Sequence, residues 1–158
     1  MQRLQPLTKS MLSRILQAAA ILMLLQPVLA AALEYRAVSV PKAILYDTPS
    51  AQGKKVFVVS QGYPVEVIVN LGDWIKVRDN QGTLNWIDAK QLTNARTLLV
   101  VQPQAELRQS ADAASSLLAR LDKDVVVDYL EPAKSGWVKV KHKDGLTGYV
   151  LATAVWGL

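Results

Sequence analysis

The chain has 158 residues, of which 51% are apolar, 20% are charged and none is Cys. This length and composition predict one medium folded domain or two small ones rather than a disordered chain. The missing Cys excludes disulfides, thiol catalysis, Cys-based zinc sites and a lipid-modified N-terminal Cys, and a single His excludes a metal centre with several His ligands.

The formal net charge of +5 depends largely on the N-terminal segment. Three of the 18 Lys and Arg residues lie in residues 1–32, which contain no acid, so the rest of the chain carries 15 cations against all 13 acids. A net charge of +2 is ordinary for folded domains, and we therefore expect no nucleic-acid partner.

Residues 1–32 have the pattern of a cleaved secretory signal peptide. A basic, polar start is followed by an apolar stretch and by the small-residue run QPVLAAA at 26–32, which allows cleavage after Ala30 or Ala32. The alternative is an uncleaved anchor, because apolar character continues to Leu33. Polar residues and a proline interrupt the run, however, and a membrane span needs about 20 apolar residues.

Export follows from this interpretation. We expect a periplasmic, cell-surface or secreted protein with no membrane span once the signal peptide is removed. That compartment permits disulfides, yet the chain uses none, so its stability must come from packed cores.

The remainder of the chain reads as a tandem repeat. Residues 73–78 (DWIKVR) match residues 136–141 (GWVKVK) at an offset of 63, whereas residues 64–67 (PVEV) match residues 124–127 (DVVV) at an offset of 60. The difference falls in a loop, because the segment 130–135 (LEPAKS) is longer than its counterpart in the first copy. Insertions in loops reduce stability little. We predict two copies, 34–93 and 96–158, joined near residues 93–95.

Within each copy the apolar residues alternate with a period of two, which predicts half-buried β-strands. The inward residues are predicted to be Val65, Val67, Val69, Ile75 and Val77 in the first copy and Val138 and Val140 in the second. Asp-Gly at 144–145 and DNQG at 79–82 separate strand pairs and indicate hairpins.

Residues 111–121 are ambiguous. Their Ala, Ser and Leu content favours a short helix by propensity, but the corresponding residues 51–60 end in the strand-like run VFVV. The repeat predicts a mobile loop followed by a strand. About five strands in about 60 residues make a small antiparallel barrel, and each copy alone has a modest core, so we expect the copies to pack on each other.

Residues 136–141 (GWVKVK) and 144–150 (DGLTGYV) resemble the C-terminal half of a bacterial Src homology 3 domain, with its Gly-Trp-x-Lys-Val and Gly-x-x-Gly-(Trp or Tyr)-Val motifs. The first copy is similar at residues 74–78 (WIKVR) and 82–87 (GTLNWI), although Asn85 replaces the second Gly; Asn tolerates positive φ. The resemblance implies two Src homology 3-like barrels. It also implies a binding module, since exported members associate with cell-wall peptides or glycans, or target partners to the envelope.

The outward positions of the paired strands carry an aromatic residue followed by cations, which can bind a carboxylate-bearing peptide or an acidic sugar by stacking and charge. The candidate ligand-binding residues are Trp74, Lys76, Trp137, Lys139 and Lys141, with Arg78 beside the first set, and Tyr46, which lies in the long-loop region that lines the peptide groove of eukaryotic relatives. The alternative is that each Trp closes a barrel or an interface while the lysines solvate a strand.

Other aromatic residues have a predicted structural role. We expect Trp86 and Tyr149 to pack inward and Trp156 to anchor the C-terminal tail, while His142 is a surface or half-buried strand residue. The second copy has Arg108-Gln109 where the first has Tyr46-Asp47, so the two copies lack equivalent grooves.

The sequence shows no phosphate loop, nucleophile elbow or calcium-loop spacing, although carboxylate pairs remain open. We expect no enzyme, no catalytic or metal-ligating residue and no cofactor. The predicted function is binding of cell-envelope material, first of all peptidoglycan peptide or glycan. The alternatives are an adaptor or sensor accessory that contacts an envelope protein and, last, an enzyme of cell-wall metabolism.

Overall fold

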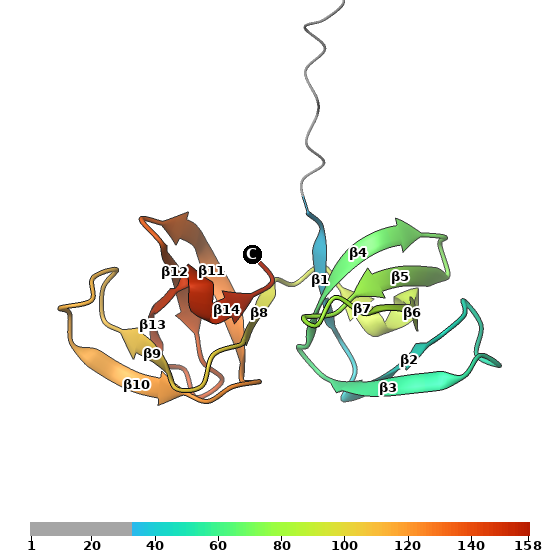
Figure 1. The fold of residues 1–158 in the computed structure, drawn as a ribbon, viewed down its shortest axis with the longest axis horizontal. Helices are drawn as coiled ribbons and strands as arrows, with labels where there is room; N and C mark the ends of the chain where they lie inside the picture. The colour runs from blue at the N-terminus through green and yellow to red at the C-terminus, as the bar shows by residue number, and fades with distance from the viewer. Residues whose placement is uncertain (1–32) are drawn as a thin grey trace, which may run out of the picture. The chain divides into compact units, whose positions relative to one another are not determined.

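The computed structural model describes residues 33–158, so the predicted signal peptide lies outside the described residues. Residues 33–158 form one compact unit built of antiparallel strands and two single 3₁₀ turns (Figure 1). The all-β prediction is confirmed.

The two seven-stranded sheets have the same strand order: each strand of the second sheet corresponds to the strand numbered seven lower in the first. The first runs β3-β2-β6-β5-β4-β1-β7 and the second β10-β9-β13-β12-β11-β8-β14. The first sheet and its 3₁₀ turn comprise β1 (Tyr35–Val38), β2 (Lys42–Tyr46), β3 (Lys55–Ser60), β4 (Pro64–Asn70), β5 (Trp74–Arg78), β6 (Leu84–Asp88), η1 (Ala89–Gln91) and β7 (Leu92–Thr93). The second comprises β8 (Thr97–Val100), β9 (Ala105–Arg108), β10 (Leu117–Leu121), β11 (Val126–Lys134), β12 (Trp137–Lys141), β13 (Thr147–Leu151), η2 (Ala152–Ala154) and β14 (Val155–Trp156). The tandem repeat is therefore present in the topology.

Each sheet curls around its own aliphatic core, as predicted for two small barrels (Figure 1). Ile75 and Val77 are 0% and 1% exposed, and Val138 and Val140 are both 0% exposed. The predicted inward set of β5 and β12 is confirmed.

Strand β4 departs from the predicted alternation. Val65 is fully buried and Val67 packs against the core, but Val69 is 40% exposed. A register shift between Val67 and Val69, where β4 pairs with β5, turns the later residue outward. The prediction that Val69 points inward was wrong because strict alternation cannot anticipate a bulge.

The ambiguous segment forms a strand. Leu117–Leu121 is β10 and pairs with β9, so the repeat predicted this segment correctly and helix propensity did not. Pairing with a neighbouring strand outweighs the small intrinsic preference of Leu and Ala for helix.

Gly148 and Asn85 occupy the same place in the two copies, but not for the reason expected from sequence. Neither residue has a positive φ. A Cβ at Gly148 would lie 2.5 Å from the carbonyl oxygen of Arg108, so glycine is needed there because β13 and β9 approach closely. Asn85 is 3% exposed, and its Nδ2 has no hydrogen-bond partner among residues 33–158.

The copies contact each other through Arg96 and Trp156, which meet Tyr35, and through Thr97, whose hydroxyl donates to the carbonyl of Gly62 at 2.6 Å. The guanidinium of Arg96 lies over the rings of Tyr35 and Tyr129, 5.4 and 5.0 Å from their centroids, and its Nη2 donates to the carbonyl of Gly157 at 2.8 Å. Trp156 meets Tyr35 edge-on, with 5.3 Å between ring centroids. The copies therefore pack on each other, and Trp156 anchors the tail as predicted.

Burial of Tyr35 predicts a loss of stability at alkaline pH. Desolvation, helped by the charge of Glu66, raises the pKa of the Tyr35 hydroxyl above its ordinary value of 10.0, although Arg96 and Arg78 act to lower it. The folded state therefore holds this proton more tightly than the unfolded state does. The contribution of the protonated Tyr35 hydroxyl to the free energy of unfolding is fully present below about pH 10, and it is lost as the pH rises through the folded-state pKa.

We expect the melting temperature of the protein to fall above about pH 10 and that of Tyr35→Phe to fall less. Thermal melts followed by circular dichroism from about pH 8 to about pH 11 measure this difference. Tyr63, whose pKa burial also raises and whose hydroxyl donates to Asn80 at 2.8 Å, contributes in the same direction, so Tyr63→Phe serves as a second variant. Identical pH profiles for all three proteins would contradict the prediction.

Candidate functional site

The first candidate surface lies on the outer side of β2, β6 and β5. Cross-strand pairing places Trp86 opposite both Tyr46 and Lys76, while Trp74 lies opposite Asp88 on the same pair of strands. All four side chains are half-buried. We call Tyr46, Trp74, Lys76 and Trp86 the first face.

The first face is an aromatic surface with one cation. The rings of Tyr46 and Trp74 meet edge-on at a centroid distance of 5.5 Å, and Nζ of Lys76 lies 5.7 Å from the ring centroid of Trp86. Lys76 forms no salt bridge with any residue of 33–158. The structure thus brings together three predicted site residues, Tyr46, Trp74 and Lys76.

The expectation that Trp86 and Tyr149 pack inward was wrong. Asn85 and Ile87 point into the first barrel and are 3% and 0% exposed, so Trp86 between them points outward. In the second barrel the buried Gly148 and Val150 flank Tyr149 in the same way. Alternation around Ile87 and Val150 was the signal that could have placed both aromatic residues on the outer surface.

The second face comprises the equivalent residues of β9, β12 and β13: Arg108, Trp137, Lys139 and Tyr149. Tyr149 pairs with both Arg108 and Lys139, and Nζ of Lys139 lies 6.0 Å from the Tyr149 ring centroid. An open groove of about 520 Å³ runs along Trp137, Lys139 and Tyr149, and its other wall is formed by Ala111 and the extended end of β11, Glu131, Pro132, Ala133 and Lys134.

Both cations of the second face already have an acidic partner. Nζ of Lys139 donates to Oε1 of Glu131 at 2.6 Å, and this hydrogen bond, with the carboxylate charge, raises the pKa of the Lys139 amine. Arg108 donates through Nε to Oε2 of Glu106 at 3.0 Å. The second face therefore offers less free positive charge than its residue types imply.

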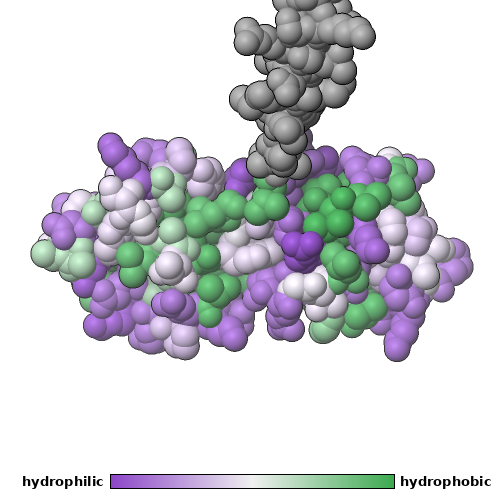
Figure 2. All heavy atoms as spheres, turned by 45° about the horizontal axis from the view of Figure 1, so that its top comes forward, coloured by the Kyte–Doolittle hydropathy of each residue, from purple (hydrophilic) through white to green (hydrophobic). Residues whose placement is uncertain are grey.

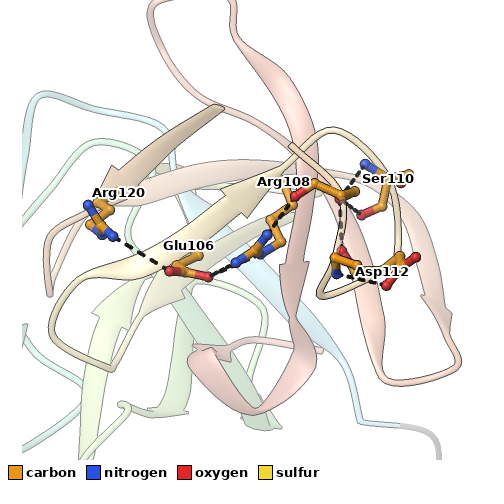
Figure 3. Close-up of polar contacts among 7 residues, drawn as sticks. Glu106, Arg108, Ser110, Asp112 and Arg120 are labelled. Carbon is orange, nitrogen blue, oxygen red and sulfur yellow. Dashed lines mark hydrogen bonds and ion pairs between the residues drawn. The ribbon is translucent and has the colours of Figure 1, made fainter. Parts of the chain in front are cut away.

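Arg108 also holds the long loop between β9 and β10, as Figure 3 shows. Its Nη1 donates to the carbonyl oxygen of Ser115 at 2.6 Å, and the loop is closed further by hydrogen bonds from the Ser115 hydroxyl to the carbonyls of Ser110 and Asp112. Glu106 is shared with Arg120, 3.8 Å away. Arg108 thus positions one border of the second face rather than presenting a free cation.

Lys141 is the predicted site residue of β12 that lies farthest from Trp137. The two are four positions apart along the strand, a rise of about 13 Å, with Lys139 between them on the same side. Lys141 instead lines a groove of about 670 Å³ together with Asp124, Asp128 and residues of the first copy, Gln61 and Gly62. Arg78, its counterpart in the first copy, is paired with Glu66 at 3.2 Å.

Other chemistry can be assessed for residues 33–158 only. That part of the chain holds no group of three or more acidic, His or Cys side chains arranged to bind a metal. Its secondary structure includes no helix with the length and apolar character that a membrane crossing requires. His142 is half-buried, as predicted, but it follows the end of β12 at Lys141 and so is not a strand residue; its Nδ1 lies 3.2 Å from Asp144.

Comparison with solved structures finds distant similarities. The chain is 16% identical to NlpC2 from Trichomonas vaginalis (TM-score 0.37; 78% of this chain and 48% of that chain covered). It is also 16% identical to an NlpC/P60 family protein from Bacillus cereus (TM-score 0.36; 77% and 55% covered) and 14% identical to the endolysin LysPBC5 CBD (TM-score 0.30; 78% and 92% covered). The chain spans about half the length of the first two structures.

No curated protein matches the chain. The bacterial SH3 (Src homology 3) domain family matches it twice, at residues 39–94 and 101–157. These matches cover most of the chain and coincide with the two sheets. The chain therefore belongs to the bacterial SH3 domain family and carries two copies of the domain.

Proposed function

We propose that this protein is an exported, non-enzymatic binding module that recognises cell-envelope material, in particular peptidoglycan peptide or glycan. The observation that carries the proposal is the aromatic surface repeated on each copy: Tyr46, Trp74 and Trp86 with Lys76, and Trp137 and Tyr149 with Lys139. Membership of the bacterial SH3 domain family supports it, because exported members commonly bind the cell wall.

The chemistry of these faces suits a peptide or sugar ligand. Half-buried rings on the outer side of a sheet can stack on the flat faces of amides and sugars, and a lysine beside them attracts carboxylates. The half-buried rings are fixed by neighbouring strands, so little side-chain entropy is lost when a ligand binds. The roles assigned to the two faces are to hold a ligand by stacking and charge, and no bond-breaking step is assigned to any residue.

Co-sedimentation with purified peptidoglycan sacculi tests the proposal. We expect the purified protein to sediment with sacculi, and Trp74→Ala and Trp137→Ala each to weaken binding by up to about tenfold, since a stacking contact contributes about 0.5–1.5 kcal/mol. Leu71→Ala, which removes a 60% exposed side chain outside both faces, should bind normally. Protein that stays in the supernatant, or Trp variants that bind like the original, would contradict the proposal.

A second candidate function, a protein-interaction adaptor, is favoured by the edge strand β3. Large apolar side chains reach the surface at several points (Figure 2), and three consecutive ones, Val56, Phe57 and Val58, are 38%, 51% and 64% exposed on β3. Since β3 ends its sheet, its free backbone groups can pair with a strand of a partner protein. Crosslinking in envelope extracts that recovers one stoichiometric protein, with sacculus binding absent, would support this function instead.

A further inference from the structure

The two faces differ in the residue that pairs with their lysine. Where β4 meets β5, the residue opposite Lys76 is Val69. Where β11 meets β12, the residue opposite the equivalent Lys139 is Glu131. One copy therefore has an aliphatic side chain, and the other a carboxylate, at the same cross-strand position.

This difference decides whether the lysine is free. Glu131 holds Nζ of Lys139 at 2.6 Å, so an incoming carboxylate must displace an acid that is tethered to the neighbouring strand. Lys76 makes no salt bridge within residues 33–158 and is held only over the Trp86 ring. A ligand carboxylate can bind Lys76 without breaking an existing ion pair.

Two acids beside the first face, Asp88 and Asp47, are engaged elsewhere. Oδ1 of Asp88, on the strand next to Trp74, accepts a hydrogen bond from the backbone of Lys90 at 2.9 Å. Oδ1 of Asp47, next to Tyr46, accepts one from the backbone of Lys54 at 2.9 Å. Both bonds direct these oxygens toward backbone donors rather than toward Lys76.

Glu131 occupies the place that Val69 has in the first copy, because each residue directly follows a register shift that the two copies share. Strand β11 extends to Lys134 and pairs with β12 through two register shifts, one on each side of Glu131, whereas β4 and β5 show one. Glu131 and the residues of the additional shift that follows it, Pro132, Ala133 and Lys134, form a wall of the groove along Trp137 and Lys139. The same segment thus shapes the second face and neutralises its lysine.

We infer that the two copies differ in ligand selectivity: the first face binds a peptide through a carboxylate, whereas the second face does not select for a carboxylate. The residue opposite the lysine, Val69 or Glu131, determines this selectivity. The inference rests on the proposed function and refines it, because it assigns the charged part of the ligand to one copy.

The indole N–H resonances of Trp74, Trp86 and Trp137 can test this assignment in the intact protein by NMR. The probe is the soluble stem peptide released from sacculi by an amidase, compared with the same peptide after its carboxyl groups are converted to amides. We expect the free-acid peptide to shift the Trp74 and Trp86 signals, the amidated peptide to do so at least tenfold more weakly, and the acid to leave Trp137 unchanged. Trp156, outside both faces, is the internal reference.

Exchanging the two residues supplies the matched variants. Val69→Glu should weaken binding of the free-acid peptide to the first face about tenfold, whereas the isosteric but uncharged Val69→Gln should not. Glu131→Val should make the Trp137 signal respond to the acid. Val69 is 40% exposed and Glu131 lies on the surface, so these variants should fold, and unchanged backbone spectra outside the two faces verify it.

Acid and amidated peptides that shift Trp74 and Trp86 equally, or not at all, would overturn the inference. Equal effects of Val69→Glu and Val69→Gln would also overturn it, because the size of the side chain rather than its charge would then be responsible. A Trp137 signal that the free-acid peptide does not shift in Glu131→Val would overturn it as well. Sacculus binding reports on the proposed function independently. Protein that binds sacculi but shows no acid preference refutes only the inference, and protein that binds the acid peptide but not sacculi refutes only the cell-wall function.

Discussion

Val140→Asp is expected to unfold the second copy. Val140 is 0% exposed and belongs to a core of aliphatic side chains contributed by β8, β9, β11, β12 and β13. An aspartate there would lose the burial of a valine and place a charge among groups that cannot pair with it. Such an uncompensated charge costs about 3–5 kcal/mol, a large part of the stability of a small domain.

The measurement is thermal unfolding together with the NMR signals of each copy. We expect the dispersed resonances of residues 96–158 to collapse in Val140→Asp, and Val138→Asp should behave in the same way because Val138 is equally buried. The control is Lys143→Asp, which places the same charge on an exposed turn residue. A normal melting temperature for Val140→Asp would mean that the alternation of β12 is assigned to the wrong side.

Arg96→Ala is expected to separate the unfolding of the two copies. The substitution removes a charged hydrogen bond to Gly157 and the stacking on Tyr35 and Tyr129. These contacts together contribute about 3 kcal/mol, and the orphaned Nε of Arg96 reduces that value. Loss of the shared contact should convert a single cooperative transition in urea into two.

Arg96→Lys separates charge from geometry, because lysine keeps the cation but lacks the planar fork that reaches a ring on each side and a carbonyl. We expect it to restore only part of the stability. Arg36→Ala is the matched control: Arg36 pairs with the exposed Glu34 at 2.7 Å, and a surface ion pair contributes about 0–1 kcal/mol. One unchanged transition in Arg96→Ala would show that the copies are stabilised independently of this contact.

The sequence predicted the fold well because two independent patterns agreed. Alternation of Ile75 and Val77 with polar residues defined strands, and the duplication extended this assignment to residues 117–121, where propensity alone favoured helix. Both patterns depend on side chains that point into a core, which leave a strong period-two pattern.

The candidate site was predictable only where a residue follows strict alternation. Trp74, Lys76, Trp137 and Lys139 lie on the outer surface as expected, and their role in binding stays a prediction. The prediction that Trp86 and Tyr149 pack inward was wrong, because the buried Ile87 and Val150 take the inward positions beside them.

Charge pairing was the part that local patterns revealed least. The Glu131–Lys139 pair depends on a bulge and on cross-strand register, which sequence spacing does not specify. Glu106 and Arg108, in contrast, are two residues apart on β9 and share one face of the strand, so alternation could have indicated their pairing. The separation of Lys141 from Trp137 likewise follows from distance along a strand, although both residues point outward.

The irregular end of β11 has an evolutionary consequence. Its register shifts begin after Tyr129, whereas Val127, Val138 and Val140 remain fully buried, so the added residues alter the chemistry of the surface without touching the aliphatic interior. In a duplicated domain, insertions at such a place can change the surface of one copy and leave the other copy unaltered. In this architecture the binding surface can therefore change through substitutions and insertions at strand ends, because these require no compensating change in the core.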